Sequence, residues 1–456
     1  MAAKAFWALL FLVAPFAGCL DPSTPANPGT DEMIAEFLAP SSDVALWNDP
    51  QQFPHPDWNW PTLTHVPPNA PKWWQPIPER PVPSKITGLE HLAQAGEGSA
   101  VDGIAVFGSL VVNPAGVVFD ISTPEKPQVL SQLDPRPGGR TAVIIPYPDG
   151  RLMVAFATGS GDIPIYEITD PTKPELVTVF DVPSGGHSIG VVPGTPILYN
   201  ANAVGSRYYP HEISDGRSIS QVEIYDLTNP DDPVLVQEWK NGYGCHMVSF
   251  YLNPDAGKLR GYCAAVDATQ IWDITDPRQP VVIATIPMPH GADPAPGYPI
   301  LAAVSHFAVV NDDATTLAVA DEFMGGAAPA CDFYVRQSGR TLSGPAGNIY
   351  FYDITEEKEP TLLGWINPGA HFTYNPDPTA SCTAHIGHLI PNGENDLLAM
   401  AFYGGGVAII DFTDGANPFI TAHWAEAQPM DVWYYNGYLI AGDASNGIDI
   451  LSLIGT

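Results

Sequence analysis

Apolar and polar residues alternate in short runs along most of the chain, and the runs recur as one repeated unit. Six segments share an apolar run that ends in an acidic residue and a Thr-containing turn, with Pro following in most of them: 117–124, 165–171, 222–230, 271–277, 349–355 and 407–414. A period of two predicts β-strands, and the turn residues predict tight reversals. No long stretch has the periodicity of a helix.

Each segment continues into another short run, such as 233–239, and two further β-rich runs precede it, such as 247–252 and 261–266. Four strands in each unit are the content of one blade of a β-propeller. We therefore predict an all-β fold, a seven-bladed β-propeller, with eight blades as the alternative.

The last unit, from Val432 to Leu453, stops after its third strand. Residues 83–91 resemble the fourth strand of the other units and lie at the other end of the repeats. Pairing them with the last unit would close the ring and leave no bare sheet edge. The N-terminal segment is therefore predicted to complete the seventh blade.

An acidic residue occupies the same turn position in all six repeats: Asp120, Glu167, Asp226, Asp273, Asp353 and Asp411. Such a row could indicate an array of calcium sites. We favour a structural role, because a carboxylate in a tight turn can accept backbone N–H bonds and the Pro that often follows fixes φ.

Composition supports many short strands and narrows the possible partners. The 456 residues include 42 Gly and 49 Pro, and the formal net charge is −32 because Lys and Arg total only 18. A surface of this charge repels nucleic acids and anionic lipid headgroups. We therefore predict no nucleic-acid partner.

The first residues have the features of an export signal. Lys4 precedes the apolar run 6–14, and small residues stand directly before Cys19. Small residues before Cys resemble a lipobox, which implies a lipid attached to Cys19, although Phe16 departs from the usual Leu. The alternative is a plain signal peptide. We expect a lipoprotein signal peptide at 1–18 and a mature protein anchored to the membrane by lipid, at the cell surface or in the envelope.

A tether is predicted over residues 19–82, before the propeller at 83–456. Its Pro content favours an extended chain. Four tryptophans are unusual in a solvated linker, so part of the tether should pack on the folded body. They are Trp58, Trp60, Trp73 and Trp74.

The repeated strand and turn, as in 271–277, resemble the LVIVD repeat of surface-exposed β-propellers in bacteria and archaea. The resemblance covers about residues 99–456. It implies the architecture and implies little about function, because propellers carry many different activities.

Histidine begins the first strand of four successive units: His187, His246, His306 and His385. The first strand of a blade is innermost, so these side chains should gather at one mouth of the central channel. The second strands end at the same mouth and carry possible supporting ligands: Asp267, Asp321, Glu322 and Asp443. Imidazoles beside carboxylates could bind a Cu, Zn or Fe ion.

Two structural roles compete with metal binding. The histidines could hydrogen-bond neighbouring blades and lock their loops, or the strand could turn the rings between the blades instead of into the channel. His388, three residues after His385, should face the opposite side of its strand and is left out of the site.

Insertions at 203–220, 288–303, 323–346 and 366–383 are predicted to lie at the same mouth and to form a rim. Four cysteines after Cys19 favour two disulfides, which we pair as Cys245 with Cys263 and Cys331 with Cys382. Free thiols or cysteine ligands are the alternatives.

Three functions remain open. The leading hypothesis is an exported, lipid-anchored propeller that binds a protein, glycan or small ligand at its loop-rich mouth. The second is a metal-dependent oxidoreductase or hydrolase built on the four histidines. The third is a structural role in the envelope, with only water in the channel.

Overall fold

The computed structural model describes residues 72–96, 102–159, 161–182, 185–201, 222–253, 257–288, 304–326, 347–368, 381–391 and 395–456. The chain divides into two compact units, Met1–His55 and Pro56–Thr456, and every described residue belongs to the second. The predicted signal peptide, Cys19 and most of the tether lie outside the described residues. None of the helices in the described ranges has the length and apolarity needed to span a membrane.

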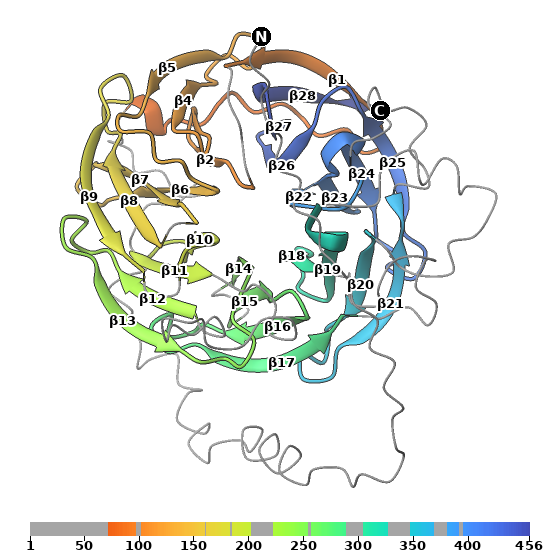
Figure 1. Cartoon of the computed structure of the whole chain (residues 1–456). Coiled ribbons are helices and arrows are strands. Elements are labelled where there is room, and N and C mark those ends of the chain that lie inside the picture. The colour runs from red at the N-terminus through yellow and green to blue at the C-terminus, as the bar shows by residue number, and fades with distance from the viewer. Residues whose placement is uncertain are drawn as a thin grey trace, which may run out of the picture. The chain divides into compact units, whose positions relative to one another are not determined.

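The second unit is a ring of seven four-stranded antiparallel sheets, each formed by strands that follow one another along the chain, with one exception (Figure 1). The first strand of each sheet lies nearest the centre of the ring. The prediction of a seven-bladed β-propeller is therefore confirmed, and the eight-bladed alternative is wrong.

The blades are numbered from the N-terminal side. Blade one contains β2 (Ala105–Phe107), β3 (Leu110–Val112), β4 (Val117–Asp120) and β5 (Gln128–Gln132). Blade two contains β6 (Thr141–Pro146), β7 (Leu152–Ala157), β8 (Asp162–Glu167) and β9 (Glu175–Asp181). Blade three contains β10 (Ser188–Val191), β11 (Ile197–Ala201), β12 (Val222–Asp226) and β13 (Val234–Trp239).

Blade four contains β14 (Met247–Asn253), β15 (Lys258–Ala264), β16 (Ala268–Asp273) and β17 (Val281–Pro287). Blade five contains β18 (Ser305–Val310), β19 (Thr316–Asp321), β20 (Ile349–Asp353) and β21 (Thr361–Ile366). Blade six contains β22 (Gly387–Pro391), β23 (Asp396–Ala401), β24 (Val407–Asp411) and β25 (Phe419–Trp424). The described helices are the short 3-10 segments η3 (Lys72–Trp74), η4 (Phe323–Gly326) and η6 (Tyr403–Gly405).

Blade seven joins the two ends of the repeats. Its inner strands are β26 (Pro429–Tyr435), β27 (Tyr438–Asp443) and β28 (Gly447–Gly455), and its outer strand is β1 (Ile86–Ala95). The ladder between β1 and β28 extends from the pair Ile86–Gly455 to the pair Ala95–Ile448. The predicted closure by the N-terminal strand is confirmed.

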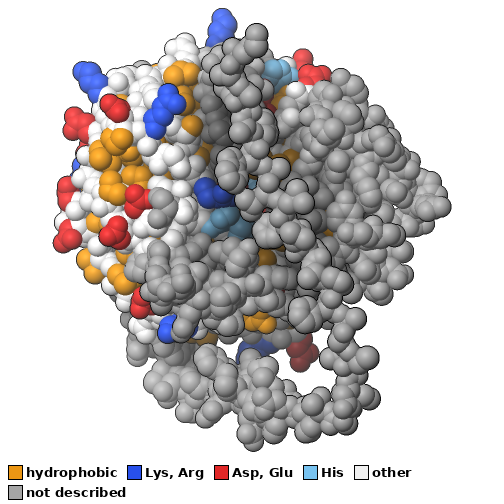
Figure 2. Space-filling view, in the orientation of Figure 1, with side chains coloured by type: hydrophobic (Ala, Val, Ile, Leu, Met, Phe, Trp, Pro, Cys, Tyr) orange, Lys and Arg blue, Asp and Glu red, His pale blue; other side chains and the backbone are white. Residues whose placement is uncertain are grey.

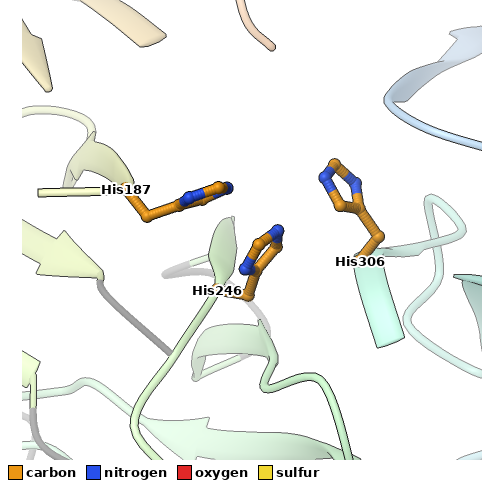
Figure 3. Close-up of side chains that lie close together, drawn as sticks. All are labelled: His187, His246 and His306. Carbon is orange, nitrogen blue, oxygen red and sulfur yellow. The ribbon is translucent and has the colours of Figure 1, made fainter. Parts of the chain in front are cut away.

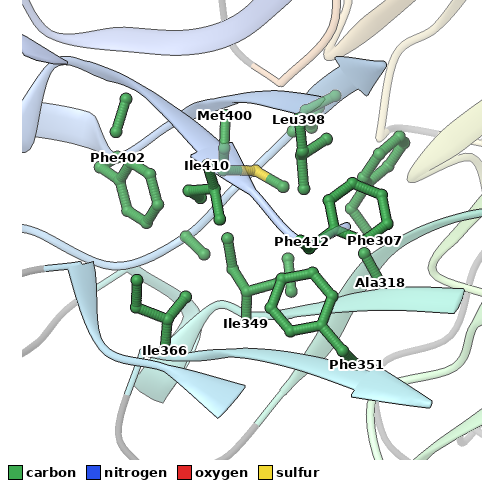
Figure 4. Packing of buried hydrophobic residues seen from close by; sticks show 14 of the residues in the cluster. Phe307, Ala318, Ile349, Phe351, Ile366, Leu398, Met400, Phe402, Ile410 and Phe412 are labelled. Atoms are coloured by element: carbon green, nitrogen blue, oxygen red, sulfur yellow. The ribbon is translucent and has the colours of Figure 1, made fainter. Parts of the chain in front are cut away.

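Apolar side chains fill every junction between neighbouring blades, and each of the seven junctions has its own buried cluster. Figure 4 shows the cluster between blades five and six, where Phe307 and Phe351 face Phe412. The cluster between blades seven and one is of the same kind and buries Ile440 against Val106. The core is therefore continuous around the ring, including the junction where the last repeat packs against the first.

The acidic turn residues have the structural role that we favoured. The Asp226 carboxylate accepts the Thr228 backbone N–H at 2.8 Å, and the Asp353 carboxylate accepts the Thr355 N–H at the same distance. Equivalent bonds occur at Asp120, Asp273 and Asp411. These carboxylates hold the turn between the third and fourth strands.

Part of the predicted tether packs on the propeller, as the tryptophan content indicated. Trp74 is 1% exposed and meets the Phe107 ring edge-on at 5.3 Å, in the cluster between blades one and two. The turn after β2 approaches η3 closely at Gly108, which has a φ of +59°, and a side chain there would collide with the Trp73 carbonyl. Trp58 and Trp60 lie outside the described residues.

Candidate functional site

One recurring backbone hydrogen bond places three of the predicted histidines at the same height along the channel. The N–H groups of His187, His246 and His385 each bond the carbonyl of an alanine at the end of the second strand of their own blade, at 2.7–3.1 Å. Arg140 makes the same bond in blade two, to Ala157. Because the bond recurs, each of these side chains starts at the same height in its blade. His306 lies at a register shift where β18 pairs with β19.

The four histidines come together in the channel. Ring centroids are 3.9 Å apart between His187 and His246, 4.8 Å between His246 and His306, and 4.0 Å between His306 and His385. Figure 3 shows three of these rings pointing toward a common space from three blades. His246, His306 and His385 are buried, and His187 is partly buried. In the orientation of Figure 1, Figure 2 shows histidine and basic side chains at the centre of the ring.

Two overlapping groups have the spacing of a metal site. Ligand atoms of His187, His246 and His306 all lie within 4.8 Å of one another, and so do those of Asp102, His306 and His385. A transition-metal ion held by imidazole nitrogens at about 2 Å requires nitrogens within about 4 Å of one another. The 4.8 Å limit of the two groups is within about 1 Å of that spacing.

The proposed lock between blades is present at two of the four rings, and it uses one nitrogen of each of these two. The His306 Nδ1 lies 3.3 Å from the His385 carbonyl in the next blade, and the His385 Nδ1 bonds the Met430 carbonyl in the blade after that. A carbonyl only accepts, so Nδ1 donates in both cases, and the neutral His306 ring has its lone pair on Nε2. Metal-binding histidines commonly have this arrangement, because the Nδ1 bond fixes the tautomer.

Two carboxylates lie against His385. Its Nε2 is 3.4 Å from Asp102 Oδ1 and 3.7 Å from Glu322 Oε1. The Arg140 Nε lies 2.6 Å from Asp102 Oδ2, and the Tyr403 hydroxyl donates to Glu322. The same carboxylates reach two other rings, since Glu322 lies 3.6 Å from the His306 Nε2 and Asp102 lies 3.9 Å from the His187 Nε2. The imidazoles and the charged groups at the mouth therefore form one connected network.

Burial and neighbouring charges give the histidines different proton affinities. Burial, followed by the neighbouring imidazoles, lowers the pKa of His187 and of His306 well below its usual value. Burial also lowers the pKa of His385, but the Asp102 and Glu322 carboxylates outweigh it and the net shift is upward. His187 and His306 are therefore neutral near pH 7, which is the form that binds a metal ion.

Of the predicted supporting carboxylates, Glu322 alone joins the histidines. Asp321 accepts backbone N–H bonds from Val304 and Gly347, and Asp443 accepts them from Gln428, Ser445 and Asn446. Asp267 is buried and belongs to neither metal-spaced group. Adjacent residues of a strand point to opposite sides, so Asp321 turns into its blade while Glu322 reaches the channel.

Two residues of the site were missed from the sequence. Asp102 holds the equivalent position in blade one, where the backbone bonds of Gly103 with Arg140 and Ala142 join that blade to blade two. Aligning the first blade with the others would have found it. Tyr403 lies in η6 with a φ of +51°, and nothing in the repeat indicates it.

His388 is correctly left out of the histidine cluster. Its ring stacks on Trp433 of blade seven with the centroids 4.1 Å apart, and it lies 6.4 Å from the Phe307 ring. Burial lowers the pKa of His388 to about 4. Within the described residues it belongs to neither metal-spaced group.

The predicted disulfide between Cys245 and Cys263 is confirmed, with their Cα atoms 5.6 Å apart. It ties the residue directly before His246 to the second strand of the same blade. Cys382 is also disulfide-bonded. Its predicted partner, Cys331, lies outside the described residues, so that pairing stays a prediction. Most of the four predicted rim insertions also lie outside them.

No family model matches the chain, and no curated protein matches it. Solved structures with a similar fold include a 6-phosphogluconolactonase-like protein of Bacteroides fragilis, described as putative (12% identity, TM-score 0.45, covering 79% of this chain and 88% of that one). Virginiamycin B lyase of Staphylococcus aureus is another (14% identity, TM-score 0.46, covering 80% and 99%). Likenesses this distant carry no inference about activity.

Proposed function

We propose that this propeller binds one transition-metal ion at the mouth of its channel and is a metal-dependent enzyme, an oxidoreductase or a hydrolase. The ligands would be the Nε2 atoms of His187, His246 and His306. The observation that carries the proposal is the convergence of three buried or partly buried imidazoles from three successive blades, with ligand atoms within 4.8 Å. Three protein ligands leave a coordination position for water or substrate, as in catalytic metal sites.

The donor set narrows the choice of ion. Neutral imidazoles suit Cu, Zn and Fe, whereas Ca²⁺ and Mg²⁺ prefer oxygen ligands. His385 is placed beside the metal rather than on it, because its Nε2 lies near two carboxylates, Asp102 and Glu322. The Nε2 atoms of His306 and His187 each lie near one carboxylate, at 3.6 and 3.9 Å. His385 would hold a hydrogen-bonding group next to the open position. The group of Asp102, His306 and His385 is the alternative ligand set, and it shares His306 with the first.

Binding of a protein, glycan or small ligand at the loop-rich mouth stays a proposal. Most of the loops that suggested this function lie outside the described residues. The spacing of the histidines, which are described, supports the metal site instead. Export and lipid attachment at Cys19 also stay proposals, supported by the N-terminal sequence. Palmitate labelling that persists in Cys19→Ser would overturn the lipid anchor.

Metal content tests the proposed function. Protein purified without a tag, loaded in turn with Cu, Zn and Fe(II) and then desalted, should retain about one ion per chain. The double variant His246→Ala plus His306→Ala should retain none, because two of three ligands are gone. His91→Gln is the matched control, since His91 lies on β1, the outer strand of blade seven, and bonds Asp449 of the neighbouring strand β28. Absence of bound metal in wild type, or equal metal in the double variant, would refute the proposal.

A further inference from the structure

A cavity of about 330 Å³ opens within the described part of the ring, between the first strands of blades seven, one, two and three. Its wall includes Val106 of β2, Val143 of β6, Val191 of β10 and Trp433 of β26. The first strands line the central channel (Figure 1), so the cavity belongs to that channel. A volume of this size lies at the lower end of the range for small-molecule sites.

The cavity lies deeper in the channel than the histidines. On β6, Arg140 stands at the level of the histidines, and residues 142–146 line the cavity. A strand rises about 3.3 Å per residue, and the cavity wall on β6 begins at Ala142, two residues after Arg140. The cavity wall therefore begins about 7 Å below the level of the histidines. A molecule in the cavity would therefore lie deeper in the channel than the proposed metal site, against blades seven, one, two and three.

Among the described residues, no charged side chain lines this cavity, although the chain has a net charge of −32. The polar side chains in the wall are already bonded within the protein. The Trp433 Nε1 donates to Asp431 at 3.0 Å, and the Thr195 hydroxyl both donates to the Val192 carbonyl and accepts the Ile197 N–H. These groups offer an ion nothing to replace its hydration.

The aromatic part of the wall is held in place. Trp433 is fixed by its bond to Asp431 and by the His388 ring stacked 4.1 Å away. His388 is neutral near pH 7, since burial lowers its pKa to about 4. A rigid apolar surface binds flat apolar molecules without a large ordering cost. Each first strand is the inner edge of its sheet. Gly103 of blade one bonds part of the β6 edge at Ala142, and backbone groups beyond such contacts could bond a single hydroxyl or carbonyl.

We propose that this cavity is a binding site for a small, uncharged, largely apolar molecule. Residues around Val143, Val191 and Trp433 form its wall, and backbone groups on the inner edges of the first strands would supply its few polar contacts. The site does not depend on the metal. If the proposed metal-dependent activity also holds, the cavity defines the substrate class as apolar and uncharged.

A neutral fluorescent probe, N-phenyl-1-naphthylamine, tests this site in the full chain. Its emission should rise and shift to shorter wavelength on binding, and saturate at one probe per chain. Val191→Phe should weaken binding at least tenfold, because the larger ring fills the cavity. Val143→Phe, from a second wall, should do the same and guards against a folding defect in the first variant. The matched control is Val234→Phe, since Val234 is in the same blade as Val191 but 55% exposed.

Metal content is measured on the same samples and should be unchanged in Val191→Phe and Val143→Phe. Failure of the metal site would then be separate from failure of the cavity site. No saturable binding by wild type would mean that the channel holds only water and would overturn the proposal. Equal binding by Val191→Phe, Val143→Phe and Val234→Phe would place the probe on the outer surface and would also overturn it.

Discussion

A chain that begins at residue 97 should not fold into a stable propeller. It lacks β1, so β28 becomes a bare edge and blade seven has three strands. It also lacks the buried residues Trp74, Ile77 and Ile86, which pack against blades one, two, six and seven. Loss of one large buried side chain costs about 3–5 kcal/mol, and whole domains are stable by only about 5–15 kcal/mol.

The measurement is thermal unfolding followed by circular dichroism and light scattering. A chain that begins at residue 72 is the control, because it keeps η3 and β1. This control should unfold in one cooperative transition, and the chain that begins at 97 should show none or should aggregate. Similar transitions in both would mean that blade seven is stable without its N-terminal strand, contrary to the closure described above.

His306→Ala should lower the affinity for the bound metal ion by at least ~100-fold. This expectation rests on the proposed metal site. His306 belongs to both metal-spaced groups, so neither alternative ligand set survives its loss. Loss of an outer contact to a metal ligand alone costs about 10–100-fold. Competition with a chelator of known affinity gives the ratio directly.

His388→Ala is the matched control for His306→Ala. Both histidines lie on first strands of neighbouring blades, but His388 stacks on Trp433 and is in neither metal-spaced group. The control should bind metal as wild type does. An equal loss in both variants would indicate a general structural defect, and no loss in His306→Ala would remove this residue from the site.

The repeat allowed most of the fold to be predicted. A period of two with an acidic turn specifies strands and their reversals locally, and the Thr228 N–H bond to Asp226 is such a local interaction. Closure by residues 83–91 followed from counting strands. The packing of Trp74 against Phe107 could be expected only in general, because it joins segments that have no shared pattern.

The candidate site was predicted where it follows the repeat and missed where it departs from it. The four histidines share one position in their blades, so alignment alone brings them together. Asp321 and Glu322 are adjacent in sequence, and the side of the strand on which each one lies decides which reaches His306, at 3.6 Å from Glu322. Tyr403 bonds Glu322 from the following blade. The two residues are far apart in sequence and share no repeated pattern, so the contact cannot be read from a single sequence.

The position of a bound metal tests the central proposal most directly. Crystals of the full chain loaded with Cu or Zn should give one anomalous-scattering peak in the channel. We expect it about 2.0–2.1 Å from the Nε2 atoms of His187, His246 and His306. No peak in the channel at saturating metal, or a peak bound by other residues, would contradict the account.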